Sequence, residues 1–406
     1  MTAVITGLGV LAPTGLGTEA YWRATLDGRS GIGPITRFDA SGYPVRLAGE
    51  LPGFDPAGDV PSRLLPQTDV WTQHGLAAAA QALRDAALDP AELPEYGVGV
   101  ATASSAGGVE FGQREIERLW SQGPRSVSAY QSIAWFYAAT TGQLSIRHGL
   151  RGQCDAVVTE AAGALDGLGQ AAATLRRGET RAVLSGGTDS PLSPFGVVCQ
   201  LASGRLSPSG DPRRAYLPFD AAASGYVCGE GGAMFVVEDA PAARGYGRVA
   251  GYAATFDPPP RSGRPRRLRH AIEQALDAAG AAPSDVGVVF ADAAGVAELD
   301  RAEAAALAEV FGPGGVPVAA PKSGVGRLYS GGAALDVVAA LLTMRDGLIP
   351  PAVHVRPDPR LGLDLVVGAP RRAGVDLCVV VARGYGGFNA AVVLTRPAPT
   401  VQGGTA

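Results

Sequence analysis

Residues 156–177 decide the fold, and they read AVVTEAAGALDGLGQAAATLRR. The first four residues form a short apolar run that is typical of a buried strand. The remainder places leucine and alanine at the spacing of one helical face, and the two arginines followed by Gly178 are typical of a helix end. The stretch therefore predicts a strand over residues 156–159, a tight turn, and a helix that ends near residue 178.

Ala161 lies in that turn, where an enzyme with this local design would carry its nucleophile. A cysteine at this point would lie at the positive end of the helix dipole, which lowers the pKa of a thiol and favours the reactive thiolate. Alanine offers neither a lone pair nor an acidic proton. We therefore expect no covalent intermediate to form at this turn.

The alternation of strand and helix extends over the whole chain as a weak internal repeat. Residues 4–10 and 248–254 both read as long strands that precede helical material. We expect further helices at 73–87, 109–121, 138–146, 270–279, 302–310 and 333–344, with strands at 97–103, 181–185 and 286–290. This pattern favours layered α/β packing in two similar halves, residues 1–245 and 246–406, within one compact unit.

The composition is consistent with a large core and a buried surface. Of the 406 residues, 46% are hydrophobic and only 18% are charged, and no linker separates the periodic segments. The low charge favours a surface hidden against a partner, although a high-GC genome would explain part of it. The net charge of -4 and the scattered basic residues predict no nucleic-acid partner. One basic run, residues 261–269, holds five arginines in nine residues and is expected to be a solvated loop.

Cysteines, histidines and the N-terminus predict a cytosolic protein without a metal or cofactor. The cysteines show no metal-binding or disulfide spacing, so we expect all four to be reduced and buried; they are Cys154, Cys199, Cys228 and Cys378. The histidines are isolated, and we expect each to be exposed or hydrogen-bonded within the structure; they are His74, His148, His270 and His354. The chain runs directly into a strand without a signal or membrane-spanning segment, so no membrane association is predicted.

Five further motifs stand in order along the chain. They are GGTD at 186–189, LPFD at 217–220, GYVCGEGG at 225–232, KS at 322–323 and GYGGFN at 384–389. The glycine-rich 225–232 lacks the Lys-Ser/Thr ending of a phosphate-binding loop, so we expect its glycines to let the backbone pass close to a site. Together with residues 156–177, these motifs resemble the β-ketoacyl synthases over almost the whole chain. The resemblance implies the thiolase fold, an α-β-α-β-α sandwich of two similar halves, with strand 156–159 pairing across a dimer axis.

The resemblance also shows what is missing. Active ketosynthases carry a Cys-His-His triad, and its positions correspond here to Ala161, Asp292 and Arg327. The two histidines converge on the cysteine in that family, so we expect Asp292 and Arg327 to form an internal ion pair; the alternative is that their side chains point apart. The retained Lys322 matches a family lysine. Asp300 and Glu303 match a family acidic pair, and all three are expected to serve as scaffold rather than as catalysts.

Two segments narrow the resemblance to one subfamily. VVFAD at 288–292 and GRLYSGG at 326–332 are similar to segments of the chain length factor, the ketosynthase β subunit of type II aromatic polyketide synthases. The resemblance implies a catalytically degenerate subunit that pairs with an active ketosynthase α subunit. The complex would act on a polyketide bound to the phosphopantetheine of an acyl carrier protein, and this chain would set its length.

Three alternatives stay open beside that interpretation. The first is a priming malonyl-carrier-protein decarboxylase, for which the family glutamine at the nucleophile position is replaced by Ala161. The second is a chain length factor of a polyene-forming system, and the third is an independent condensing enzyme, which the loss of the whole triad disfavours.

The resemblance finally implies where the polyketide lies and which surfaces meet the partner. The cavity wall corresponds to Val109, Gly112, Ile116 and Trp120, whose inward residues are small or moderate, so we expect about ten to twelve ketide units; alternatively these residues are ordinary core. The expected interface consists of Trp135, Phe136, Tyr137, Val157 and Val158. A tight loop beside the former active site is expected at Gly384, Tyr385, Gly386 and Gly387.

Overall fold

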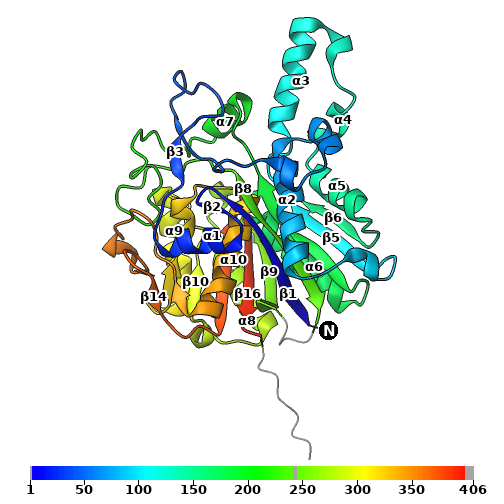
Figure 1. Ribbon diagram of the computed structural model, residues 1–406. Helices are drawn as coiled ribbons and strands as arrows, with labels where there is room; N and C mark the ends of the chain where they lie inside the picture. The colour runs from blue at the N-terminus through cyan, green and yellow to red at the C-terminus, as the bar shows by residue number, and fades with distance from the viewer. Residues whose placement is uncertain (1, 241–244, 398–406) are drawn as a thin grey trace, which may run out of the picture.

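A computed structural model describes residues 2–240 and 245–397. Its strands join in the order β13-β11-β10-β15-β16-β9-β1-β8-β7-β5-β6, with β2 paired to β1 (Figure 1). The two halves of this order meet at β1 and β9, which pair only at Val4 with Arg248 and at Ile5 with Gly247. The strands therefore divide into two sheets that share one short seam.

The first sheet holds strands from the N-terminal half. Its members are β1 (Ala3–Ala12), β2 (Gly15–Leu16), β5 (Val98–Ala103), β6 (Cys154–Val157), β7 (Ala182–Asp189) and β8 (Gly231–Asp239). Every residue of β1, β5 and β7 is buried, as expected for apolar strands covered on both faces. The neighbours β1, β8 and β7 are antiparallel, whereas β7, β5 and β6 are parallel.

The second sheet repeats this scheme. Its members are β9 (Gly247–Phe256), β10 (Val288–Phe290), β11 (Pro317–Ala319), β13 (Asp364–Leu365), β15 (Leu377–Arg383) and β16 (Phe388–Thr395). Antiparallel pairing of β9, β16 and β15 again gives way to parallel pairing toward β10, β11 and β13. This shared order confirms the two similar halves that the repeated strands predict.

Helices fill three layers around the two sheets. The middle layer is α6 (Gly163–Arg176) and α10 (Ser330–Asp346), each in contact with strands of both sheets. The outer layers are α2 (Val70–Asp85) with α5 (Ala139–His148) on the first sheet, and α8 (Leu268–Ala279) on the second, with α9 (Ala297–Phe311) packed beside α8. Only the last two residues of α10 reach the surface, because the helix carries alanine, valine and leucine on all of its faces. The molecule is thus the five-layered α-β-α-β-α sandwich of the thiolase fold.

The remaining elements lie around this sandwich. The helices are α1 (Thr18–Leu26), α3 (Val109–Gln122), α4 (Gln131–Ala134) and α7 (Pro194–Leu201), and the short strands are β3 (Ile32–Pro34), β4 (Leu47–Gly49), β12 (Leu348–Ile349) and β14 (Arg371–Arg372). The short 3₁₀ helices are η1 (Pro56–Gly58), η2 (Ser62–Gln67), η3 (Pro90–Glu92), η4 (Pro124–Ser126), η5 (Glu160–Ala162), η6 (Pro260–Ser262), η7 (Pro283–Asp285), η8 (Pro321–Gly324) and η9 (Pro359–Leu361). In Figure 1, α3 stands out from the top of the body.

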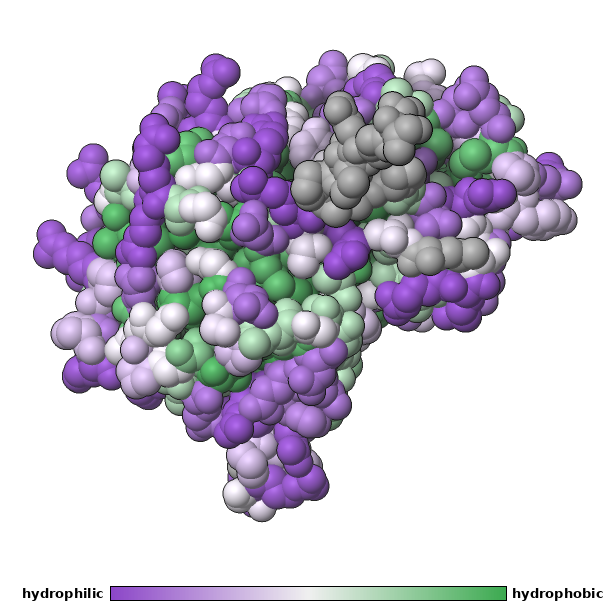
Figure 2. Space-filling model, turned by 90° about the horizontal axis from the view of Figure 1, so that it is seen from below, coloured by the Kyte–Doolittle hydropathy of each residue, from purple (hydrophilic) through white to green (hydrophobic). Residues whose placement is uncertain are grey.

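Figure 2 shows the face of the molecule that lies opposite α3. Seen from below, hydrophobic residues are visible across the middle of the molecule, and hydrophilic residues form much of its outline (Figure 2). Among the helices of the described residues, none combines the length and the apolar character that a membrane span requires.

Three local predictions were wrong. The strand expected at 156–159 ends at Val157, because the chain must turn through Glu160, whose φ is 52°. Cys154 and Cys199 are exposed rather than buried, since one begins the edge strand β6 and the other lies on the short surface helix α7. His74 is buried on α2, yet both of its ring nitrogens lack a hydrogen-bond partner, so it is not a hydrogen-bonded structural histidine.

Candidate functional site

The turn at Ala161 brings the first half of the chain against the second. Ala161 is buried in η5, directly before α6, and this turn packs against α10 of the middle layer and against β15 and β16 of the second sheet. Gly384, at the end of β15, has to be glycine here, because a Cβ atom would lie 2.3 Å from the carbonyl oxygen of Thr159. This turn, residues 159–162, is called the elbow below. It lies directly against residues of the C-terminal half.

Asp292 and Arg327 meet beside this turn, as the sequence predicts. Nη2 of Arg327 lies 3.3 Å from Oδ1 of Asp292, and both side chains are almost fully buried. Arg383, at the end of β15, is not among the residues predicted from the sequence, and its Nη2 lies 3.3 Å from the other oxygen of the same carboxylate. Arg383 also donates its backbone N–H to Asp292 at 3.0 Å and accepts a hydrogen bond from Arg327 at 2.8 Å. Two guanidinium groups thus close around one carboxylate.

A second carboxylate completes the cluster. Glu303 of α9 accepts hydrogen bonds from the backbone N–H groups of Asp292 and Ala293 at 2.7 and 3.0 Å, and from Arg383 at 2.9 Å. Burial opposes ionisation of Asp292, but the guanidinium groups of Arg327 and Arg383 outweigh it and hold the pKa of this carboxyl below its usual range. Burial raises the pKa of Glu303. The carboxylate of Asp292 therefore stays ionised, and both of its oxygens are engaged.

Lys322 and Asp300 are also engaged. Nζ of Lys322 lies 2.6 Å from Asp336 of α10, a partner that the sequence analysis did not identify, and both side chains are buried. Burial raises the pKa of Asp336 to about 6. Asp300 accepts backbone hydrogen bonds from Phe219 at 2.9 Å and Gly295 at 3.0 Å, and burial raises its pKa to about 7. Each of these charged side chains therefore binds either backbone N–H groups or a side chain of opposite charge.

Strained backbone marks the same region. Glu160, Ala293 and Tyr329 have φ values of 52°, 49° and 53°, in the left-handed region that residues with a side chain rarely adopt. They lie one or two residues from Ala161, Asp292 and Arg327. Such strain persists where the surrounding structure fixes the backbone, and it concentrates at functional sites. Strained backbone thus gathers at the three positions Ala161, Asp292 and Arg327.

The loop between β15 and β16 covers this region. Tyr385 donates its backbone N–H to Oε2 of Glu160 at 2.8 Å, which ties the loop to the elbow. An open cavity of about 910 Å³ lies beneath it and reaches Asp292, Arg327 and Arg383. Arg264 and Arg266 of the basic run line this cavity as well, so the expected solvated loop contributes to its edge.

The expected cavity wall and the expected interface lie next to each other. A Cβ atom on Gly112 would lie 3.9 Å from Cβ of Trp135, and Gly108 donates its backbone N–H to the carbonyl of Trp135 at 3.0 Å. Farther along α3, Ile116 is half exposed and Trp120 is 82% exposed. The base of α3 therefore packs on the aromatic segment, while its outer end projects into solvent.

The residues expected at the interface form two groups, the aromatic segment and the end of β6 at the edge of the first sheet. Trp135, Phe136 and Tyr137 are each exposed over more than a third of their surface, which is unusual for three consecutive aromatic residues. Val158 is 41% exposed, whereas Val157 is buried within β6, the outermost strand of its sheet.

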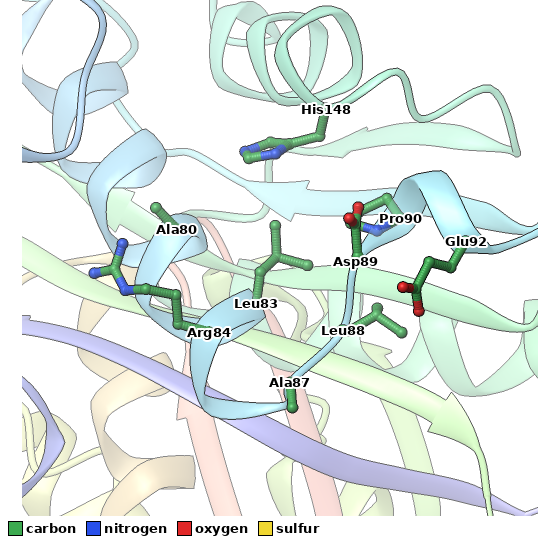
Figure 3. Close-up of a pocket in the computed structure, with 9 residues that line it drawn as sticks. All are labelled: Ala80, Leu83, Arg84, Ala87, Leu88, Asp89, Pro90, Glu92 and His148. Atoms are coloured by element: carbon green, nitrogen blue, oxygen red, sulfur yellow. The ribbon is translucent and has the colours of Figure 1, made fainter.

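A separate pocket lies on the outer side of α2. It has a volume of about 470 Å³ and is formed by the end of α2, by η3 and by His148 of α5 (Figure 3). Burial lowers the pKa of His148 to about 4, so its ring is neutral near pH 7. None of its lining residues belongs to the cavity at Asp292.

Comparison with known proteins agrees with this geometry. Residues 2–243 match the N-terminal domain model of the β-ketoacyl synthases, and residues 246–356 match the C-terminal domain model. The chain is 59% identical to the tetracenomycin polyketide synthase ketoacyl synthase beta subunit of Streptomyces glaucescens, over 97% of this chain and 98% of that protein. It is 57% identical to the actinorhodin polyketide putative beta-ketoacyl synthase 2 of Streptomyces coelicolor, over 98% and 100% of the two chains.

Solved structures agree as well. The ishigamide ketosynthase/chain length factor superposes with a TM-score of 0.90 at 27% identity, covering 98% of this chain and 99% of that one. These matches show that the chain belongs to the β-ketoacyl synthase family, among the ketosynthase β subunits, or chain length factors, of type II polyketide synthases.

Proposed function

We propose that this chain is a non-catalytic subunit that pairs with an active ketosynthase and sets the length of the poly-β-ketone made by the complex. The observation that carries the proposal is the cluster of Asp292, Arg327, Arg383 and Glu303 beside Ala161. A condensing centre needs a nucleophile, and groups that can take up or release a proton near neutral pH. Alanine supplies no nucleophile, and an arginine stays protonated at every relevant pH.

The cluster also argues against a decarboxylase. Ala161 has no amide that could imitate the carbonyl of an acyl thioester. Asp292 keeps a pKa below its usual range and is engaged by two guanidinium groups, and Glu160, directly before Ala161, is engaged by Arg327 and by the backbone N–H of Tyr385. Both carboxylates are therefore poor general bases.

The proposed partner surface is the exposed aromatic segment at Trp135, Phe136 and Tyr137 together with the free edge of β6 and Val158. Aromatic side chains are enriched in the buried centres of stable interfaces, and an unpaired edge strand offers backbone groups for pairing with another chain. Both features lie on the same side as the base of α3. The relative from Streptomyces glaucescens is named as the beta subunit of a polyketide synthase, which supports a second, catalytic subunit here. The acyl carrier protein that bears the growing polyketide is the second proposed partner.

The proposed cavity lies between α3 and the partner, with Val109, Gly112 and Ile116 along its wall. Small side chains leave room for more two-carbon units, so we expect a long product of about ten to twelve ketide units. A chain that no longer fits stops growing, and the protein thereby acts through volume rather than through a reactive group.

The decisive experiment reconstitutes the cognate ketosynthase, the carrier protein and a malonyl donor with and without this chain, and identifies the products by mass spectrometry. A long product that depends on this chain supports the proposal. Equal product without the chain would show that it is not the length-determining subunit. A product of eight units or fewer that depends on this chain would keep the partner role and reject the long cavity.

A further inference from the structure

Helix α3 has few contacts to hold it in place. Of its 14 residues only Phe111, Gly112 and Glu115 are buried, and most of its length stands away from the body (Figure 1). A wall that limits a cavity has to keep a fixed position, because a shift of about 1 Å at a positioned group changes what the site accepts. The contacts at the base of α3 therefore decide how well that position is fixed.

Arg37 makes the main ionic contact at this base. Its Nη2 lies 2.5 Å from Oε2 of Glu110, in the first turn of α3, and its Nη1 lies 3.0 Å from Oε2 of Glu230. One planar guanidinium thus spans two carboxylates with two different nitrogens, which a lysine could not do in the same geometry. Arg37 connects α3 to a residue outside it.

Glu230 is itself fixed to the body of the protein. It stands directly before β8, its side chain is only 3% exposed, and it accepts hydrogen bonds from Ser190 at 2.7 Å and from the backbone N–H of Leu51 at 3.1 Å. The backbone N–H of Arg37 donates to Glu50 at 3.3 Å, so the segment that carries Arg37 is held as well. The contacts that start at Glu110 therefore lead through Arg37 to Glu230, a buried carboxylate whose oxygens accept hydrogen bonds from the body of the protein.

A second contact secures the adjacent residue of α3. Oδ2 of Asp69 accepts the backbone N–H of Phe111 at 2.7 Å, and Oδ1 of the same side chain accepts the N–H of Trp71 in the first turn of α2. This contact fixes the end of the helix at one point. Farther along α3, Gln113 accepts the backbone N–H of Phe195 in α7 at 2.8 Å, and Glu115 accepts that of Ser128 at 2.6 Å. Beside these hydrogen bonds, the ion pair at Glu110 is the charged contact that ties the first turn of α3 to the body.

We propose that Arg37 is a positioning residue for chain length, which sets the tilt of α3 through Glu110 while Glu230 holds Arg37 in place. The inference rests on the proposed function, since it takes α3 as the wall of the polyketide cavity. Arg37 contacts no substrate in this role. Loosening α3 is expected to change which lengths are released rather than how much polyketide is made.

The test compares Glu110→Gln and Arg37→Gln with the matched control Glu117→Gln in the complete complex. Glu117 lies farther out on the same helix, and its side chain accepts a hydrogen bond from Gln113 of α3 itself, at 3.0 Å. Glu110→Gln removes only the contact to the helix, so Glu230 keeps its arginine. We expect each of the first two variants to raise the ratio of a neighbouring chain length to the main product about fivefold, equivalent to about 1 kcal/mol, and the control to leave it unchanged.

Complex formation and total polyketide separate positioning from simple loss of structure. Positioning predicts that both stay within about twofold of the unmodified complex, and that the double variant Glu110→Gln/Arg37→Gln shifts the ratio no more than Arg37→Gln alone, since both single variants break the same contact between Arg37 and Glu110. An unchanged ratio in a complex that still makes polyketide would overturn the inference. Polyketide of the same length without this chain would instead overturn the proposed function.

Discussion

Arg327 reaches Asp292 across a buried distance of 3.3 Å. The pair is part of a closed arrangement, because Arg383 binds the second oxygen of Asp292 and Glu303 binds Arg383 in turn. Buried charges of this kind are costly when one partner is removed and contribute little when the whole group is present. The cluster is therefore a scaffold that depends on all of its members.

The first prediction concerns Arg327→Met. Loss of this guanidinium leaves Asp292 buried with only one cationic partner, so we expect the free energy of unfolding to fall by roughly 3 kcal/mol. Arg345→Met is the matched control. Arg345 makes ion pairs with Glu19 and Asp346 at the surface, and we expect a loss below about 1 kcal/mol there. Denaturant unfolding followed by circular dichroism measures both, and equal losses would contradict the scaffold role of the cluster.

The second prediction concerns His74→Leu. Both ring nitrogens of His74 are buried without a hydrogen-bond partner, and Phe54 packs edge-on against the ring at 4.8 Å. An apolar side chain of similar size removes that cost, so we expect a gain of about 1–3 kcal/mol at pH 7. The exposed His270→Leu serves as control and should change little. Destabilisation by His74→Leu would show that ordered water satisfies the ring.

The same variant should alter the acid sensitivity of the protein. Burial lowers the pKa of His74 from its ordinary 6.5 to about 3 in the folded chain. Between these values the unfolded chain binds a proton that the folded chain does not, so the stability of the unmodified protein falls as the pH falls through this window. His74→Leu should flatten that part of the stability curve, as measured by thermal melting between pH 4 and pH 8.

Local pattern and motif order could predict much of this site. Ala161 lies in the turn that the apolar run and the helical face predict, whereas the pairing of Asp292 with Arg327 is implied by the resemblance of the surrounding motifs to the β-ketoacyl synthases. The contribution of Arg383 could not be predicted, because it stands 91 residues from Asp292 and contacts it only through the pairing of β15 with β10. A lone arginine at a strand end carries no signal of that kind.

The errors have a similar physical origin. A strand over residues 156–159 is the natural reading of two valines and a threonine, which favour extended backbone. The structure ends β6 at Val157, because Glu160 must take a left-handed conformation to bring its carboxylate to Tyr385. Arg37 also escapes a sequence argument, since its two partners lie 73 and 193 residues away. Tertiary contacts decide these positions.

The third prediction tests whether the elbow can regain reactivity. Ala161→Cys restores a thiol at the start of α6, but Asp292 and Arg327 cannot replace the histidines as proton acceptor and donor. We expect no polyketide when this variant is combined with a ketosynthase whose own nucleophile has been changed to alanine. The same variant with an intact ketosynthase should give the ordinary product, which shows that the complex still forms. Polyketide from the first combination, detected by mass spectrometry, would mean that catalytic capacity survives in this chain.

The last prediction concerns Gly112, where α3 meets the aromatic segment. A Cβ atom at this position would have ordinary contacts, at 3.8 Å to Gln131 and 3.9 Å to Trp135, so Gly112→Ala should be tolerated without steric conflict. A phenylalanine needs far more space and must either displace Trp135 or extend along the helix into the proposed cavity. Because either outcome reduces the volume beside α3, we expect Gly112→Phe to shorten the main product by about one extension unit or more. Mass spectrometry of the reconstituted complex measures this, with Gly112→Ala as the control for loss of glycine alone. Unchanged length from a Gly112→Phe complex that forms normally would place the limiting wall elsewhere and leave this part of α3 as ordinary packing.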